Sequence, residues 1–379
     1  MARNRTIYQS AAVYAGPDKT AKGDAGWVAE TGTSNSPNQL KRIQSANYSF
    51  DIARTDVNQF GELAAIDRVI LESPTVSFDT SWYLCNFYNE DKVGLKVNQT
   101  GVAEDDLVSV LTDILVNNAD ERNYYVRVVS EGSDAVTFAD GANNNVIGIG
   151  NGFLASYSAE GAVGGFPTAN ITIEGLNMAF TTKESGWAPW IKASDGTTNA
   201  ALGIAGGTAD GKAFDLPTAT SSGASTSDVT AIKPGNITLT LPSSQGGADL
   251  SGIAVQSFNA SFDLAREPLN KLGSRFAFTR EITFPVTASM SCDALVGDLT
   301  TGDLADMLTR NPDQKVIVRL DDDTDAAEHM AIVMKSAKLD SQNFSMGIGD
   351  NQTVTLNWST QVGSAAQSGI GIFLSGYHN

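Results

Sequence analysis

The chain has 379 residues, of which 41% are hydrophobic, and its formal net charge is −18. This length exceeds what one hydrophobic core usually supports, so we expect two domains. A surface that holds nucleic acid needs lysine and arginine against the phosphates, so the acidic balance excludes such a surface. It does not exclude a surface past which nucleic acid slides without binding.

Targeting and redox features are sparse. No stretch approaches the roughly 20 apolar residues of a membrane-spanning helix, and no apolar segment follows the charges of the first residues. We therefore expect a soluble protein that folds in a cytoplasm and does not insert into a membrane. The two cysteines, Cys85 and Cys292, are predicted to be small core residues, because a disulfide framework would need more of them.

The first predicted domain spans residues 1–182. It opens with an apolar strand, Ile7 to Tyr14, and a long loop to Asn38. A β-hairpin with a long tip at about 55–66 follows. In its first strand Tyr48, Phe50 and Ile52 form an apolar side that is predicted to face the core. The opposite side of the two strands carries small polar residues: Asn47, Ser49, Asp51, Thr75, Ser77 and Asp79.

The rest of this domain alternates between strands and one helix. Residues 84–97 are predicted to be a strand, whereas the apolar spacing over 103–118 predicts a helix with an acidic first turn. A β-branched strand is expected over 124–129, and two strands flanking a turn over 153–177.

The middle of the chain, residues 183–232, is rich in Gly, Ser and Thr and is predicted to be a linker or an insertion. Its apolar cluster around Trp187 and Trp190 suggests that the early part packs on the first domain. A strand within 234–242 then begins a second domain, predicted to span 233–360. Residues 361–379 are assigned to a C-terminal tail.

The second domain repeats the first. Residues 44–54 return as 256–266 at an offset of 212 with 8 of 11 positions identical, and 13 of the 27 positions from Gln44 to Ile70 are identical. Chance would give roughly two. This predicts two copies of one folding unit. The second copy repeats the hairpin with a tip at 267–278, a short helix at 302–310 and a strand at 315–320. Its small polar residues are Asn259, Ser261, Asp263, Thr287, Ser289 and Ser291.

Signals for catalysis are weak, so neither an enzyme nor a cofactor is predicted. Only two histidines occur, His329 and His378, and neither lies near a nucleophile signature. The acidic run from Asp321 to Asp325 lacks the glycine and closing glutamate of an EF-hand. It is read as a solvated turn, with an adventitious Ca²⁺ as the alternative.

Three segments of the first copy resemble bacteriophage tail tube (major tail) proteins. They are the Ile43–Phe50 strand with its Phe-Asp-Ile-Ala-Arg continuation, the Pro74-Thr-Val-Ser-Phe-Asp-Thr strand, and Leu154-Ala-Ser-Tyr-Ser with Val163-Gly-Gly-Phe-Pro-Thr-Ala. The duplicated arrangement is similar to that of long-tailed siphophages whose tube subunit carries two tube domains. The second copy departs from the pattern, with Gly347-Ile-Gly-Asp350 where the first has Gly164-Gly-Phe-Pro167.

The resemblance implies a mainly β fold, namely two tandem β-sandwich or barrel domains that each carry one flanking α-helix. It also implies a virion subunit, assembled in the host cytoplasm, whose stacked rings form a conduit for DNA. Two domains per chain make three chains per ring the expectation. The partners implied are further copies, the tape measure, the tail terminator and baseplate or tip proteins, whereas DNA passes without specific binding.

Within that ring the twelve small polar residues of the hairpins are predicted to face the lumen, with the solvated outer side of a sheet as the alternative. The tips are predicted to make contacts between subunits or rings, through Asp56, Asn58, Phe60, Gly61, Leu269, Asn270 and Gly273. Two other functions stay open: a single-ring tail component such as a terminator, and a secreted carbohydrate-binding or adhesive β-protein.

Overall fold

A computed structural model gives the fold of most of the chain. The structure describes residues 11–18, 38–71, 74–98, 106–116, 120–129, 135, 145–181, 232, 234–240, 254–270, 272, 277, 279–295, 312–321, 329–346, 351–364 and 367–376. Within these ranges the protein is mainly β and its strand pairs are antiparallel except for one. This confirms the predicted fold class at the level of a mainly β protein.

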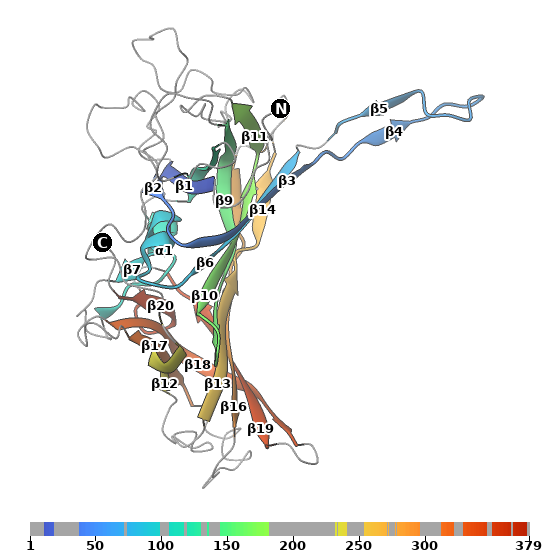
Figure 1. Cartoon of the computed structure of the whole chain (residues 1–379). Helices are drawn as coiled ribbons and strands as arrows, with labels where there is room; N and C mark the ends of the chain where they lie inside the picture. Colours follow the sequence, from blue (N-terminus) through green and yellow to red (C-terminus); the bar gives the residue numbers. More distant parts are fainter. Residues whose placement is uncertain are drawn as a thin grey trace.

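Eight long strands form one continuous wall (Figure 1). In spatial order they are β3 (Ile43–Asp51), β6 (Thr75–Tyr83), β10 (Thr168–Gly175), β9 (Asn145–Ala162), β13 (Ala254–Asp263), β16 (Val286–Leu295), β19 (Thr353–Val362) and β18 (His329–Ser345). The two predicted hairpins are therefore confirmed as β3–β6 and β13–β16. They lie in the same sheet, separated by β10 and β9.

Alternating side chains give this wall two different faces. Along β6, β10, β16 and β19 every second residue is buried, as the period-two pattern of the sequence predicts. The buried positions include the largest fully buried side chains of the wall: Phe78, Trp82, Tyr157, Phe262 and Trp358. The other face carries small polar residues, so the core lies on one side of the wall only.

A second layer covers the apolar face and lies on one side of the wall in Figure 1. One part pairs with the first half of β9 and comprises β2 (Asn38–Gln39), β1 (Ala11–Asp18), β8 (Glu121–Val128) and β11 (Asn177–Thr181). The other part pairs with the first half of β18 and comprises β12 (Ile237–Thr240), β17 (Gln314–Asp321), β20 (Gly371–Ser375) and β7 (Val97–Asn98). The strands β9 and β18 thus each belong to both layers. At the bend from one layer to the other each has a non-glycine residue of positive φ, Asn151 (52°) and Ser336 (49°).

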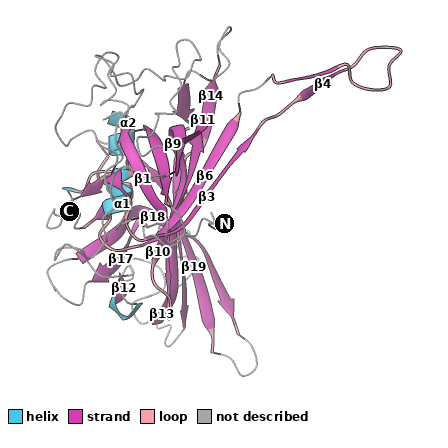
Figure 2. Cartoon of the chain, turned by 45° about the horizontal axis from the view of Figure 1, so that its top comes forward, coloured by secondary structure: helices cyan, strands magenta, loops and turns pink. Residues whose placement is uncertain are grey.

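Two hairpin arms extend from the wall. The first consists of β4 (Thr55–Val57) and β5 (Asp67–Val69), and Figure 2 shows it projecting far from the rest of the chain. The second consists of β14 (Arg266–Leu269) and β15 (Thr279–Ile282). Both arms occupy the predicted long tips. Gly61, at the end of the first arm, has φ of 95°, a conformation that suits a residue without a Cβ atom.

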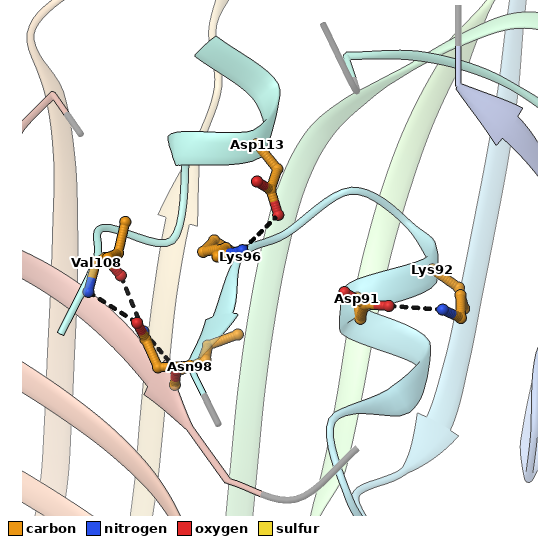
Figure 3. A network of polar contacts seen from close by, with 7 residues as sticks. Asp91, Lys92, Lys96, Asn98, Val108 and Asp113 are labelled. Atoms are coloured by element: carbon orange, nitrogen blue, oxygen red, sulfur yellow. Dashed lines mark hydrogen bonds and ion pairs between the residues drawn. The ribbon is translucent and has the colours of Figure 1, made fainter. Parts of the chain in front are cut away.

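For residues 84–118 one prediction was wrong and another held only in part. Residues 84–97 contain the helix α1 (Tyr88–Lys92) rather than a strand. The predicted helix over 103–118 is helical in its described part mainly at α2 (Thr112–Val116). Asn98 gives the reason, because its side chain accepts from the Val108 N–H (2.8 Å) and donates to the Val108 carbonyl (2.9 Å) (Figure 3). These bonds hold the backbone of Val108 outside a helix.

The residues assigned to a C-terminal tail include a buried strand. Within 361–379, β20 pairs with β18 and also, in parallel, with β7 from the first half of the chain. The Asn98 side chain donates to the Leu374 carbonyl at 2.9 Å, and the Val110 N–H donates to the Ile372 carbonyl at 3.3 Å. The end of the chain therefore links the two halves. The linker 183–232, apart from Ile232, and the second predicted helix lie outside the described residues.

Candidate assembly surfaces

The twelve small polar residues predicted to act together share one face of the wall. The register places Asn47 opposite Asp79 and Asn259 opposite Ser291, which is the same pairing at the repeat offset of 212. Thr172 donates to Asp79 at 2.8 Å, and the hydroxyls of Ser261 and Ser289 lie 3.0 Å apart. All twelve are exposed or partly exposed. Whether this face lines a lumen stays a prediction.

The same face extends over four further strands that were not assigned to it from the sequence. It includes Ser156, Ser158, Glu160, Asn170, Thr172, Glu174, Ser341, Asn343, Asn357 and Ser359. The alternation of residues 153–177 predicts strands, but it does not show which side chains lie on the polar face. Six carboxylates lie on the face: Asp51, Asp79, Glu160, Glu174, Asp263 and Asp293. Within the described strands the registers place one lysine, Lys338, at one end of the face. Glu174 is also neutralised there, because Arg280 of the second arm forms an ion pair with it at 2.7 Å.

The two outer strands of the wall each have an unpaired edge. Among the described residues β3 pairs only with β6, and residues 341–345 of β18 pair only with β19. Large apolar side chains are exposed on both edges: Tyr48 (39%), Phe50 (57%), Phe344 (47%) and Met346 (76%). The prediction that Tyr48 and Phe50 face the core was therefore wrong, because among the described residues no strand lies beyond β3 to cover them. An unpaired apolar edge of this kind is a template for pairing with another chain.

The equivalent positions inside the wall are covered. Strand β13 pairs with β9, and Ala260 and Phe262, the counterparts of Tyr48 and Phe50, are 0% and 2% exposed. The Phe262 ring stacks on Tyr157 with centroids 5.5 Å apart. A Cβ atom on Gly161 would lie 2.6 Å from the Phe258 ring, so glycine lets the two strands approach there. We call this pairing of β9 with β13 the internal seam.

The root of the second arm docks on the first half of the chain. The Arg266 side chain is 1% exposed and donates to both carboxylate oxygens of Asp120, at 2.5 and 2.9 Å. It also donates to the Leu154 carbonyl (2.9 Å) and lies over the Phe153 ring. Burial raises the pKa of Asp120, and the hydrogen bonds and charge of Arg266 oppose that shift. Arg54, the counterpart of Arg266, is exposed.

The predicted tip residues project into solvent. Phe60 and Leu63 in the first arm and Leu272 in the second are fully exposed. Asp56 forms an ion pair with Arg68 at 2.6 Å across the first arm. Asp56, Asn58, Phe60, Gly61, Leu269 and Asn270 are all described, whereas Gly273 lies outside the described residues. The arms therefore present apolar groups at their ends, and their role as contacts stays a prediction.

One acidic group lies inside the core beneath the wall. Glu90 in α1 is 1% exposed and accepts hydrogen bonds from the Trp82 indole (2.9 Å) and the Tyr157 hydroxyl (3.4 Å). Burial raises its pKa to about 7. Nearby, in the second layer, exposed or half-buried charges pair locally, Asp91 with Lys92 (2.7 Å) and Lys96 with Asp113 (3.6 Å) (Figure 3).

Catalytic and metal chemistry finds little support in the described residues. They contain no group of three or more His, Cys, Asp or Glu residues placed to hold a metal ion. His378 and Asp322 to Asp325 lie outside the description. Cys85 and Cys292 are buried and unbridged, which confirms their prediction as core residues. Among the helices of the described residues, none is long and apolar enough to cross a membrane.

Comparison with known proteins gives weak matches. No protein-family model and no curated protein matches the chain. Among solved structures, a chain of the tail of an empty GTA particle with C6 symmetry aligns at a TM-score of 0.26 and 14% identity, covering 35% of this chain and 96% of that chain. A chain from the virion of a native gene transfer agent particle aligns at 0.25 and 12%, covering 38% and 98%. At these scores the likeness identifies neither a family nor a function.

Proposed function

We propose that this chain is a tail tube subunit of a phage-like virion, and that copies of it pair edge to edge into a ring that encloses a channel. The observation that carries the proposal is the eight-stranded wall with an apolar, unpaired strand at each side. Such edges are an aggregation hazard in a free monomer, and closure of the sheet on itself removes them. The sequence resemblance to tail tube proteins points to the same assembly.

The two faces of the wall suit a tube. Its apolar face is covered by the second layer, so the polar face is the one left to line a channel. In the described strands that face carries six carboxylates and one lysine per chain, and one of the carboxylates, Glu174, is paired with Arg280. Carboxylates repel phosphates, whereas a row of lysines or arginines would release counterions and hold DNA. A wall of this composition would let DNA pass without binding it.

Three copies per ring follow from the repeat. The strand order β3-β6-β10-β9 is followed by β13-β16-β19-β18, with equal registers in both hairpins. We infer that these halves are two tube domains of one chain. If a ring holds six such domains, as the resemblance implies, three chains supply them and contribute 3 × 8 = 24 strands.

Two measurements test the proposal. Negative-stain microscopy of the purified protein should show hollow rings or tubes. Native mass spectrometry should give a trimer of about 120 kDa, which is three times the 39.9 kDa of one chain. Rings of six chains would contradict the stoichiometry, and a protein that stays monomeric at high concentration would contradict the tube.

The arms give a way to separate a tube subunit from a single-ring tail component. We expect the exposed ends of the arms to contact the next ring, because they carry Phe60 and Leu63 outside any packing contact. Deleting residues 58–65 should then leave rings intact and abolish tubes. If the unaltered protein forms single rings and never tubes, a terminator-like component is the better assignment.

A further inference from the structure

The internal seam shows how two copies of the chain would meet. The two halves of the wall superpose in register as well as in order: Ser156 lies opposite Thr172, and Ser341 lies opposite Asn357. Both long strands have their register shift one residue before these positions. The positive-φ residues Asn151 and Ser336 differ by the same 185 positions as Ser156 and Ser341. Strand β18 is therefore the counterpart of β9, and β3 is the counterpart of β13.

The hydrogen bonds of the internal seam fix its geometry. The Leu264 N–H donates to the Ala155 carbonyl (2.7 Å), and the Val163 N–H donates to the Gln256 carbonyl (2.9 Å). In an antiparallel ladder hydrogen-bonded pairs alternate with non-hydrogen-bonded pairs. Ser261, which lies opposite Ser158 on the polar face, is accordingly in a non-hydrogen-bonded pair. Side chains approach each other most closely in such pairs.

We propose that residues 341–346 of one copy pair with residues 46–51 of a second copy, antiparallel, in the register of the internal seam. This register places Ser341 opposite Asp51, Asn343 opposite Ser49, and Ser345 opposite Asn47. The proposal rests on the proposed ring and specifies its contact. The partner at both open edges is thus another copy of this chain.

The exposed apolar residues fit this register. Phe344 of one copy falls opposite Tyr48 of the next, on the face where Ala159 meets Ala260 in the internal seam. Met346 falls opposite Ala46, where Gly161 meets Phe258. At this position a large residue faces a small one in both contacts. In the proposed contact the large residue, Met346, directly follows β18, whereas in the internal seam the large residue, Phe258, comes from β13. Pairing would cover the four apolar side chains that the wall leaves exposed on its edges.

A cavity beneath β3 supports the same contact. It has a volume of about 350 Å³ and is lined by Ala46 and Tyr48 together with residues of β1 and β8. Its counterpart beneath β13, lined by Phe258 and by residues of β9 and β12, has about 50 Å³. At this smaller cavity lie Gly161 and Ala162 of β9 and Val163, which directly follows that strand. Among the described residues no such strand lies at the larger cavity, and the proposed register brings Met346 of the next copy to it.

Disulfide trapping of the assembled protein tests the register. In the variant Ser49→Cys with Asn343→Cys the two thiols would lie in a non-hydrogen-bonded pair, whose Cα atoms are about 4.5 Å apart and within disulfide range. Oxidation should convert most of the protein into linked dimers and trimers on a non-reducing gel. The native Cys85 and Cys292 are buried and should not contribute.

Two matched variants define the register. Ser49→Cys with Gln342→Cys is shifted by one residue, so its thiols would lie on opposite faces of the sheet. Asn47→Cys with Asn343→Cys is shifted by two residues, which places the Cα atoms about 7–8 Å apart. Both should link at least tenfold less than the in-register pair.

The outcomes separate this inference from the proposed function. If microscopy shows rings and a shifted pair links as much as or more than the in-register pair, the proposed register is wrong but the proposed ring is not. Dimers formed by Ser49→Cys alone would indicate β3–β3 pairing and overturn the inference as well. A protein that forms no ring and no linked species contradicts both proposals. Cross-linked species on the gel no larger than trimers, together with rings by microscopy, would support both proposals.

Discussion

At the scale of single residues, the two halves of the chain put similar side chains into different environments. Arg54 and Arg266 occupy the same place in the repeat, yet Arg266 is buried against Asp120 and Leu154 whereas Arg54 is exposed. The difference arises because the second arm leaves the wall beside β9, whereas in the described part of the chain β3 has a neighbouring strand only on its β6 side. Substitutions at such matched positions therefore measure what the internal seam contributes.

We predict that Arg266→Ala destabilises the unassembled chain by about 3 kcal/mol, because removing one partner of a buried ion pair leaves the other charge poorly solvated. Arg54→Ala is the matched control and should change the free energy of unfolding by less than about 0.5 kcal/mol. Urea unfolding of both variants measures the difference. Equal losses would show that the contacts of Arg266 with Asp120 and Leu154 contribute nothing specific.

Glu90 predicts a pH dependence of stability. Its pKa is raised from 4.5 to about 7 in the folded chain, so the folded state binds the proton more tightly than the unfolded state. Stability from this group is therefore fully present below pH 4.5 and is lost as the pH rises through 7. The loss is about 3 kcal/mol, from a shift of roughly 2.5 units at 1.36 kcal/mol each.

Glu90→Gln should abolish this dependence while it keeps an oxygen that can accept from Trp82. The difference in unfolding free energy between the variant and the parent chain should then grow from pH 4.5 to pH 8 in favour of the variant. Glu62→Gln, on the exposed first arm, serves as the control. A constant difference across this range would show that Glu90 does not titrate with folding.

At the scale of strands and helices, period-two alternation predicted much of the fold. The hairpins and the shared polar face follow from it because each side chain of a strand points to one face or the other. The helix predicted over 103–118 is interrupted at 107–109 because the bonds of Asn98 to Val108 outweigh apolar spacing. The strand predicted over 84–97 is replaced by α1, which the apolar pattern did not reveal. Tyr48 and Phe50 were placed in the core because a strand pattern does not reveal which neighbour is missing.

The open edge of β18 yields a prediction about assembly. Met346→Asp should raise the concentration needed for ring formation at least tenfold, because pairing would bury an unpartnered carboxylate at a cost of several kcal/mol. The melting temperature of the unassembled chain should not change, since Met346 is 76% exposed there. Sedimentation of the parent chain and of the Met346→Asp variant over a range of concentrations measures assembly.

Phe180→Asp is the control for that experiment. Phe180 is also exposed (64%) but lies on β11, which pairs with β9 and is not one of the two outer strands of the wall. It should leave assembly unchanged. If both substitutions block rings equally, general surface charge rather than the edge of β18 controls assembly.

At the scale of the whole molecule, charge and shape have to be considered together. The net charge of −18 would exclude a protein that holds DNA, but it suits a channel through which DNA moves. In the described strands, the face we assign to the channel has six carboxylates and Lys338 per chain, and Arg280 pairs with one of the carboxylates, Glu174. A trimeric ring would therefore carry 3 × 6 = 18 carboxylates against three lysines and three arginines.

Charge reversal at two of these positions tests which face is the inner one. Asp51 and Asp263 are counterparts in the repeat, and both are exposed on the polar face. Asp51→Lys with Asp263→Lys would replace 3 × 2 = 6 carboxylates per ring by ammonium groups. If this face lines the channel, such tubes should form, bind duplex DNA and slow its passage. The effect should weaken steeply as salt rises, because binding releases counterions from the phosphates.

The control makes the same change of charge on the other side of the wall, with Asp91→Lys and Asp106→Lys in the second layer. Those tubes should attract DNA only to their outside, so DNA ejection from virions should keep its normal rate at low salt. Retarded ejection confined to the Asp51 and Asp263 variant would support the inner assignment of the polar face. If ejection is equally fast in both variants at low salt, or if cryo-EM of the tube places Asp51 on its outer surface, the polar face is the outer side of the assembly.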